Sequence, residues 1–379
     1  MVRAHPLVRQ ARPRCSAVTT ATASTRARRH TLEACLTIVA MAATAFATAC
    51  DRSPAHAPGH LAATARRFAP PLDDTVWTAL LPAGDSGSPS IMVADGRAVY
   101  VGDPIQSNVI AIDAATGARR WETRKSADSA VARLAPRLIT PRRRGGIFAV
   151  DGEKGSVVVL SPDGALLRRL EFATQRHVET VCELPDGRLL VSLEDANGTL
   201  VTTTDTGRVL KAHALPWSDL QRMSGLVSAV RLAPTHDGCL AALLNGRGFA
   251  PFDGSRFQPP IPYVERVALP EVREQRRATV DGFVVSTYLA EHVGGALDVA
   301  VTPSAIVTSF GGHSDDRNHL VDVYDTQGHY LESYRTRRAV TALAANDSLL
   351  FILTHRAGEP IVVALRWNRQ DLTRTASTR

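Results

Sequence analysis

The chain contains little lysine, and it has no long apolar run beyond residue 49. Only 3 of its 44 Lys and Arg residues are lysine, a bias that reflects genome composition rather than phosphate binding. Seven arginines and one glutamate in residues 1–49 account for +6 of the formal net charge of +7, which leaves about +1 for the remaining residues. The positive charge is therefore concentrated in the first segment, and we expect no nucleic-acid partner.

The sequence also lacks the motifs of several common enzyme classes. It contains no Gly-x-Ser-x-Gly nucleophile elbow, no His-Glu-x-x-His helix and no phosphate-binding loop. We therefore expect a binding protein rather than an enzyme.

The first 49 residues have the pattern of an export signal. A basic segment precedes an apolar stretch at residues 34–49, which is about sixteen residues long and too short to span a membrane comfortably. The stretch ends in Ala-Thr-Ala before Cys50 and resembles a bacterial lipobox, which implies lipidation of Cys50; an ordinary signal cleaved nearby is the alternative. Residues 50–71 are rich in Pro and Ala, and we expect a flexible tether with a reach of roughly 25 Å.

Five short turns that begin with Asp and end with Gly recur along the chain. The spacings between successive turn glycines are 47, 43, 47 and 74 residues, so the last interval carries an insertion. A strand-rich repeat of roughly 40 to 50 residues predicts a β-propeller. The turn glycines are Gly117, Gly164, Gly207, Gly254 and Gly328.

Strand patterns between these turns predict six blades within residues 72–369, followed by a polar tail at 370–379. A blade has four antiparallel strands, a to d, from the central channel outward. The last blade lacks strand d, and residues 75–81 can supply it, which would close the ring and cover both edges. We expect an insertion near residues 259–294, with a charged and helical segment at 263–277; a degenerate seventh blade there is the alternative.

The first blade resembles known propeller repeats. Residues 99–113 resemble an NHL-type repeat, and residues 113–121 are similar to the strand-end motif of quinoprotein-type repeats. The whole region resembles bacterial six-bladed propeller lipoproteins of the NHL or TolB-like kind. This resemblance implies an all-β six-bladed fold and an envelope location outside the cytoplasm, on the inner or the outer membrane, but no particular reaction.

Polar residues in the predicted b–c loops are the candidates for a site, because these loops gather around one mouth of the channel. Most are turn formers that would simply solvate a loop. His313 and His319 are weak candidates for a zinc or calcium site, although no cofactor is expected. The ligand-binding candidates are Asp103, Glu194, Asp195, His313, Asp315, His319 and His355.

The sequence thus favours an exported, lipid-anchored and monomeric propeller that binds or scaffolds an envelope protein or a small ligand. The alternative is a metal-dependent hydrolase of the lactonase type, for which Glu183, Asp298 and Asn346 are candidate channel residues. Cys182 and Cys239 are expected to be two buried thiols, although an exported chain can also join them in a disulfide.

Overall fold

The computed structural model describes residues 66–82, 89–172, 177–193, 199–217, 230–265, 267, 269–279, 282–289, 294–311, 316 and 318–367. The chain divides into two compact units, residues 1–59 and 60–379, and every described residue belongs to the second. No helix of the described segments combines the length and the apolar character needed to cross a membrane.

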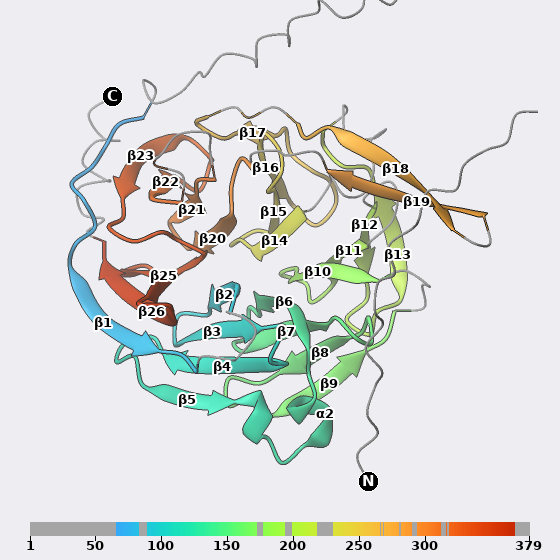
Figure 1. Cartoon of the computed structure of the whole chain (residues 1–379), viewed down its shortest axis with the longest axis horizontal. Helices are drawn as coiled ribbons and strands as arrows, with labels where there is room; N and C mark the ends of the chain where they lie inside the picture. Colours follow the sequence, from blue (N-terminus) through green and yellow to red (C-terminus); the bar gives the residue numbers. More distant parts are fainter. Residues whose placement is uncertain are drawn as a thin grey trace, which may run out of the picture. The chain divides into compact units, whose positions relative to one another are not determined.

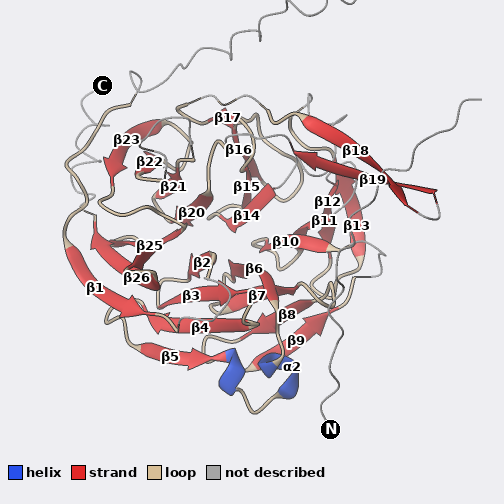
Figure 2. Ribbon diagram, viewed as in Figure 1, coloured by secondary structure: helices blue, strands red, loops and turns tan. Residues whose placement is uncertain are grey.

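The described residues form six four-stranded antiparallel sheets arranged in a ring (Figures 1 and 2). This is a six-bladed β-propeller, as the sequence predicts. Blade 1 contains β2 (Ile91–Ala94), β3 (Ala98–Asp103), β4 (Asn108–Asp113) and β5 (Arg119–Glu122). Blade 2 contains β6 (Pro136–Pro141), β7 (Ile147–Asp151), β8 (Val157–Leu160) and β9 (Leu166–Leu170). Blade 3 contains β10 (Val178–Glu183), β11 (Leu189–Leu193), β12 (Thr199–Thr203) and β13 (Val209–His213).

The other three blades follow the same order of strands from the channel outward. Blade 4 contains β14 (Val230–Pro234), β15 (Cys239–Leu243), β16 (Gly248–Phe252) and β17 (Ile261–Pro262). Blade 5 contains β20 (Asp298–Thr302), β21 (Ala305–Ser309), β22 (Leu320–Tyr324) and β23 (Tyr330–Arg335). Blade 6 contains β24 (Ala342–Ala345), β25 (Leu349–Arg356), β26 (Glu359–Arg366) and β1 (Thr75–Leu80).

The N-terminal strand closes the ring as predicted. β1 is the outer strand of blade 6 and pairs antiparallel with β26, with Thr78 opposite Val363. The residues just before β1 make a further contact that the sequence did not indicate. Phe68 forms an isolated parallel bridge with Ser333, so this segment lies along the outer edge of blade 5.

The five recurrent turns all connect strands c and d of their blades, as expected. Their glycines have φ values of +75° to +92°, a region that residues with a Cβ rarely occupy. In four of the turns, those of Gly117, Gly164, Gly207 and Gly328, the backbone N–H of the glycine donates to a preceding carbonyl, as between Gly328 and Asp325 at 3.0 Å. The period seen in the sequence is therefore the period of the outer hairpins.

The insertion contains a hairpin rather than the expected helical segment. β18 (Val272–Thr279) and β19 (Gly282–Leu289) pair only with each other among the described strands. Residues 283–288 are rich in aromatic and β-branched side chains, which favour strands, and an Asp-Gly pair at 281–282 is a hairpin signal. The described part of residues 259–294 adds this hairpin and β17, and it forms no seventh blade.

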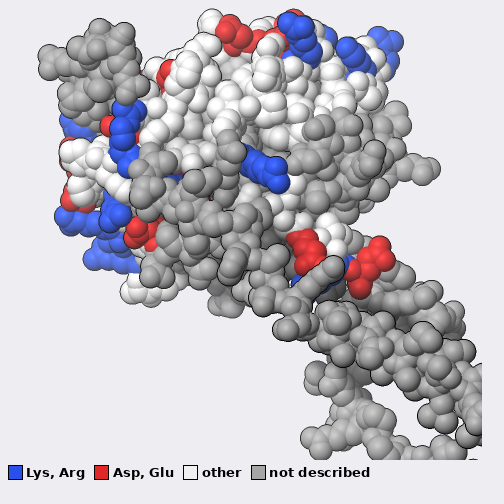
Figure 3. Space-filling model, turned by 90° about the horizontal axis from the view of Figure 1, so that it is seen from above, with Lys and Arg blue, Asp and Glu red and all other residues white. Residues whose placement is uncertain are grey.

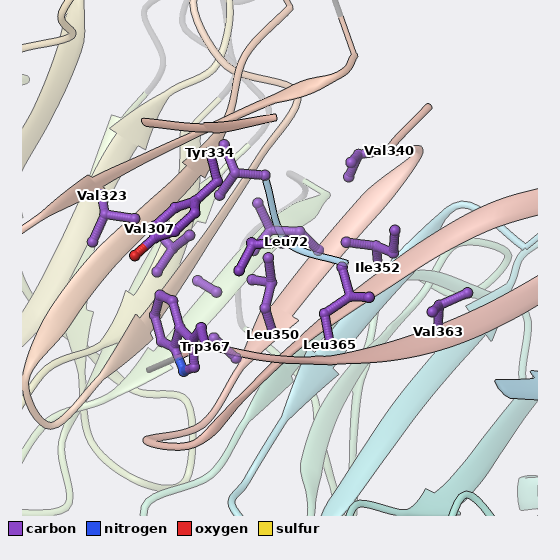
Figure 4. Packing of buried hydrophobic residues seen from close by; sticks show 14 of the residues in the cluster. Leu72, Val307, Val323, Tyr334, Val340, Leu350, Ile352, Val363, Leu365 and Trp367 are labelled. Atoms are coloured by element: carbon purple, nitrogen blue, oxygen red, sulfur yellow. The ribbon is translucent and has the colours of Figure 1, made fainter. Parts of the chain in front are cut away.

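Side chains from facing blades form the core. Between blades 5 and 6, Val307 and Val323 pack with Leu350 and Leu365, and Trp367 lies at the edge of the same cluster (Figure 4). Within the described segments, helical turns occur only between blades 1 and 2, as η2 (Thr123–Lys125) and α2 (Ser129–Ala132) (Figure 2). Burial between the sheets, rather than helix packing, therefore holds the ring together.

Cys182 and Cys239 form a disulfide, and the expectation of two free thiols is wrong. Cys182 lies in strand a of blade 3, and Cys239 lies in strand b of blade 4. Their Cα atoms are 6.3 Å apart although 57 residues separate them in sequence. Only the side-by-side placement of the two blades brings the sulfur atoms together.

Candidate functional site

The predicted ligand residues that the structure describes lie in three different blades. The Asp103 carboxylate accepts hydrogen bonds from the backbone N–H groups of Ile105 and Gln106, at 3.0 and 2.9 Å. Nδ1 of His319 lies 3.1 Å from the backbone oxygen of Thr336. His355 is exposed near the tip of the hairpin between β25 and β26.

The remaining predicted site residues are Cys50, Glu194, Asp195, His313 and Asp315, and they lie outside the described residues. The proposed pairing of His313 with His319 is therefore untested. No group of three or more His, Cys, Asp or Glu side chains in the described segments could hold a metal ion.

A buried ion pair occupies the central channel. Arg231 of blade 4 lies 3.5 Å from Asp298 of blade 5, measured from Nε to Oδ1, and its Nη2 donates to the backbone oxygen of Met92 in blade 1. The other carboxylate oxygen of Asp298 accepts from the backbone N–H of Leu343 in blade 6 at 3.0 Å. Four blades thus meet at this pair, and a cavity of only about 20 Å³ remains beside it.

Burial raises the pKa of the Asp298 carboxyl, while the Arg231 guanidinium and the N–H groups of Leu343 and Val299 lower it. These partners use both carboxylate oxygens. Asp298 therefore connects neighbouring blades through both of its carboxylate oxygens, and neither oxygen is free for a ligand.

Glu183 is also committed to contacts between blades. Its carboxylate accepts from the backbone N–H of Arg143 at 3.1 Å, and its backbone oxygen accepts from Nε of the same arginine at 2.7 Å. The Arg143 guanidinium donates further to backbone oxygens of blade 4, including that of Gly238 at 2.6 Å. Arg143 therefore ties blade 2 to blades 3 and 4.

Asn346, the third channel candidate, shapes a turn between β24 and β25. Its side-chain oxygen accepts from the backbone N–H groups of Ser348 and Leu349. With Asp298 and Glu183 held as described, the three candidates do not form a set of free oxygens, and they do not fit the calcium centre that a lactonase-type site requires.

A groove of about 630 Å³ lies between blades 4 and 5, and we call it the blade 4/5 groove. It is formed by the a–b and c–d turns of the two blades, so it lies at the end of the strands opposite the b–c loops. Its lining residues are Thr235, His236, Asp237, Gly238, Leu240, Pro251, Phe252, Asp253, Gln258, Pro259, Ile261, Val301, Thr302, Pro303, Ile306, Thr326 and Gln327.

The short outer strand of blade 4 explains why this groove exists. β17 has only two residues, and the prolines at 259, 260 and 262 cannot donate backbone hydrogen bonds to a longer ladder. The chain instead turns back on itself, and the N–H of Gln258 donates to the backbone oxygen of Pro251 at 2.8 Å. The space that a full outer strand would cover is left open.

The groove has an apolar floor and an acidic rim. Leu240, Phe252 and Ile306 are buried below it, whereas His236 and Asp237 are exposed at its edge. Several hydrogen bonds together lower the pKa of Asp253 to about 2, and the largest effect comes from the Ser255 hydroxyl, which donates at 2.7 Å. This second rim carboxylate is therefore ionised at neutral pH. The described residues that line the groove include no Lys or Arg, and the site can therefore accept apolar groups next to a cation.

Sequence reasoning directed attention to the opposite, b–c face and missed this groove. Its walls come from turns that lie about 90 residues apart, near Asp237 and Thr326. The one local signal was the run of prolines after the fourth recurrent turn, which predicts a shortened outer strand.

The fold and these contacts define the class of the protein. It is a six-bladed β-propeller in which the Arg231–Asp298 ion pair fills the central channel and the blade 4/5 groove is open. No model of a known protein family and no curated protein matches the chain. Among solved structures, a Bacteroides fragilis protein described as exported is similar over 79% of this chain and 99% of its own, with a TM-score of 0.52 and 11% identity.

Two further structures match at lower similarity. Virginiamycin B lyase from Staphylococcus aureus aligns with 77% of this chain and 99% of its own, with a TM-score of 0.47 and 11% identity. BamB from Moraxella catarrhalis aligns with 74% of this chain and 84% of its own, with a TM-score of 0.37 and 16% identity. At these identities the comparisons show the propeller fold alone.

Proposed function

We propose that this protein is an exported binding module of the cell envelope and that it holds a segment of a partner protein in the blade 4/5 groove. The observation that carries the proposal is the groove itself. Its volume of about 630 Å³ is within the range of protein ligand sites, roughly 300 to 1,000 Å³. Its apolar floor and polar rim have the composition of a recognition site.

The chemistry of the groove selects the kind of segment. Ile261 and Val301, which are partly exposed in the groove, supply apolar contact for an aliphatic side chain, and the exposed Asp237 carboxylate attracts a positive charge. We therefore propose an extended segment in which an aliphatic residue has a neighbouring Lys or Arg. Such a segment gains burial from the floor and charge complementarity from the rim.

Three features support an envelope location. Residues 1–49 have the pattern of an export signal, and the Cys182–Cys239 disulfide is of a kind that persists in oxidising compartments. The similar Bacteroides fragilis protein is also described as exported. We further propose that lipidated Cys50 and the tether at residues 50–71 hold the propeller at a membrane surface; whether the ligand candidates of the b–c loops take part in binding stays a prediction.

Filling the groove tests the function. Thr326 is exposed in the c–d turn that lines the groove, and Thr206 is exposed at the matching turn of blade 3, away from it. Full-length Thr326→Trp and Thr206→Trp variants should both fold. Affinity capture from detergent-solubilised membranes should lose the partner with the first variant and retain it with the second.

Synthetic overlapping peptides of the captured protein then identify the segment. We expect the binding peptides to contain an aliphatic residue beside Lys or Arg, and their affinity to fall by about 10-fold or more in Thr326→Trp. Equal capture by the two tryptophan variants, or binding by peptides without a cation, would overturn the proposal.

A further inference from the structure

The outer strand of blade 3 is largely exposed. Four of the five residues of β13 are exposed, as are four of the six residues of β1 in blade 6, whereas the outer strands of blades 1, 2 and 5 have at most two exposed residues each. β13 pairs with β12 on one side, and no strand of the described residues pairs with its other edge. Among the described residues, one row of backbone donors and acceptors on this edge is therefore left for pairing with another chain.

The exposed residues of β13 include two adjacent apolar side chains. Val209 and Leu210 have 42% and 46% of their surface exposed. Val209 lies opposite Thr203 and Lys211 lies opposite Thr202, so Leu210 is the extra residue of a β-bulge. β13 therefore presents two adjacent exposed apolar side chains beside its outer edge. This combination is typical of a strand that receives a partner strand.

A second groove, of about 490 Å³, runs beside this strand. It lies between residues 211–216 and the turn at residues 255–260, and the rings of His213 and Phe257 meet in it edge to face, with centroids 6.5 Å apart. Lys211 and Arg256 are among the described residues that line it, and none of these described lining residues is acidic. Asp253 lies 3.8 Å from Arg256, measured from Oδ2 to Nε, so the positive charge of Lys211 dominates the strand side of the groove.

The propeller already receives a strand in this way at another blade. Residues 67–69 lie along β23, where the N–H of Ser333 donates to the oxygen of Arg67 at 2.8 Å and the N–H of Ala69 donates to the oxygen of Ser333 at 3.0 Å. The adjacent Arg66 places its charge between Glu265 and Asp322. The edge of blade 5 is thus occupied by a strand whose charge is opposite to that of its seat.

We propose that the outer edge of β13 binds an extended acidic strand of a partner protein by backbone pairing, with Lys211 selecting for negative charge. This strand would lie outside the blade 4/5 groove, although the turn at residues 255–260 forms one wall of both grooves. The inference does not rest on the proposed function, because Leu210 and Lys211 contribute nothing to the blade 4/5 groove.

Two labelled ten-residue peptides test the proposal with the purified protein. One alternates valine with glutamate, and the other alternates valine with lysine. Fluorescence anisotropy should show the acidic peptide binding with a Kd below about 1 mM and at least 5-fold more tightly than the basic peptide. Amide hydrogen exchange of the complex should slow at residues 209–213.

Surface variants separate this edge from the others. Leu210→Asp adds a repelling charge and should weaken the acidic peptide by about 5-fold or more, whereas Leu167→Asp on the outer strand of blade 2, where the leucine is 54% exposed, should have no effect. The double variant Lys211→Glu with Arg256→Glu should reverse the preference in favour of the basic peptide. Absence of binding below 1 mM, equal affinity for both peptides, or an equal loss in Leu167→Asp would overturn the proposal.

Discussion

Cys182 and Cys239 join the innermost strand of blade 3 to the second strand of blade 4, and both residues are fully buried. The two cysteines are 57 residues apart in sequence. The segment between them includes β11, β12 and the exposed strand β13. The disulfide therefore connects the blade with the free outer edge to the blade that borders the groove.

Removing this disulfide should destabilise the propeller. Constraining an unfolded loop of this length contributes about 2 to 4 kcal/mol, so Cys182→Ala with Cys239→Ala should lower the Tm by about 5 to 15 °C, measured by circular dichroism. Reductant should lower the Tm of the wild-type protein and leave that of the double variant unchanged. An equal effect of reductant on both proteins would show that the bond is not the cause.

The buried ion pairs of Arg66 with Glu265 and Asp322 should contribute more to stability than an ion pair at the surface. The Arg66 guanidinium is buried, makes two contacts with Asp322 and one with Glu265, and stacks over the Phe310 ring at 4.1 Å. Arg66→Ala leaves two buried carboxylates without their cation and should cost about 3 to 5 kcal/mol in the free energy of unfolding, measured with urea.

The matched control is Arg337→Ala, which removes the exposed ion pair with Asp73. It should cost less than about 1 kcal/mol. Arg66→Lys should recover only part of the loss, because a lysine cannot make the two parallel contacts with Asp322. If the two alanine variants lost equal free energies of unfolding, the buried ion pairs of Arg66 would be no more important than a surface pair.

Ionisation of Asp298 should give stability a particular dependence on pH. Because burial raises the pKa of Asp298 in the folded state, the folded protein binds this proton more tightly than the unfolded chain does. Stability is therefore lost as pH rises from the ordinary carboxyl range through the raised pKa, and this cost is absent at lower pH. Asp298→Asn cannot ionise, so the variant should gain stability relative to the wild type as pH rises across that window.

Asp113 provides a control of opposite sign. The Thr116 hydroxyl lowers the pKa of Asp113, and its ionised form therefore contributes stability that is lost as pH falls. Relative to the wild type, Asp113→Asn should lose stability as pH rises through the carboxyl range. Urea unfolding at a series of pH values measures both slopes, and slopes of the same sign would refute the assignment.

The sequence predicted the architecture because propeller repeats are local. Alternating strands and turn glycines such as Gly117 are visible within short windows, and the need to cover an open edge assigned residues 75–81 to the last blade. The prediction of a helical segment at 263–277 was wrong. The charged residues there concealed a strand pattern, and the segment ends in a β-hairpin in which Arg277 lies opposite Val284.

The grooves and the polar contacts between blades could not be predicted in the same way. Arg66 meets Asp322 across 256 residues, and Arg143 meets Gly238 across 95. Such contacts leave no repeating pattern in the sequence, because they depend on how the twist of each sheet positions the neighbouring blades. The polar loops on the b–c face were visible in the sequence, whereas the blade 4/5 groove depends on the absence of a long outer strand.

Substitution of Gly328 should separate turn strain from groove shape. Gly328 has a φ of +85°, and a Cβ added there would lie 2.2 Å from Cδ1 of Ile261 in the wall of the blade 4/5 groove. Gly187 has nearly the same φ, +87°, with no heavy atom within 4 Å of the added carbon. Gly187→Ala should therefore show only the backbone cost of about 1 to 2 kcal/mol, and Gly328→Ala should show that cost plus displacement of Ile261.

The displaced Ile261 side chain would alter the groove, so binding of the partner segment should weaken in Gly328→Ala and stay unchanged in Gly187→Ala. Urea unfolding gives the two stability losses, and peptide titration gives the two affinities. If both variants bind the segment equally although Gly328→Ala is the less stable, Ile261 does not shape the seat of the ligand, and the segment must lie nearer to the Asp237 side of the groove.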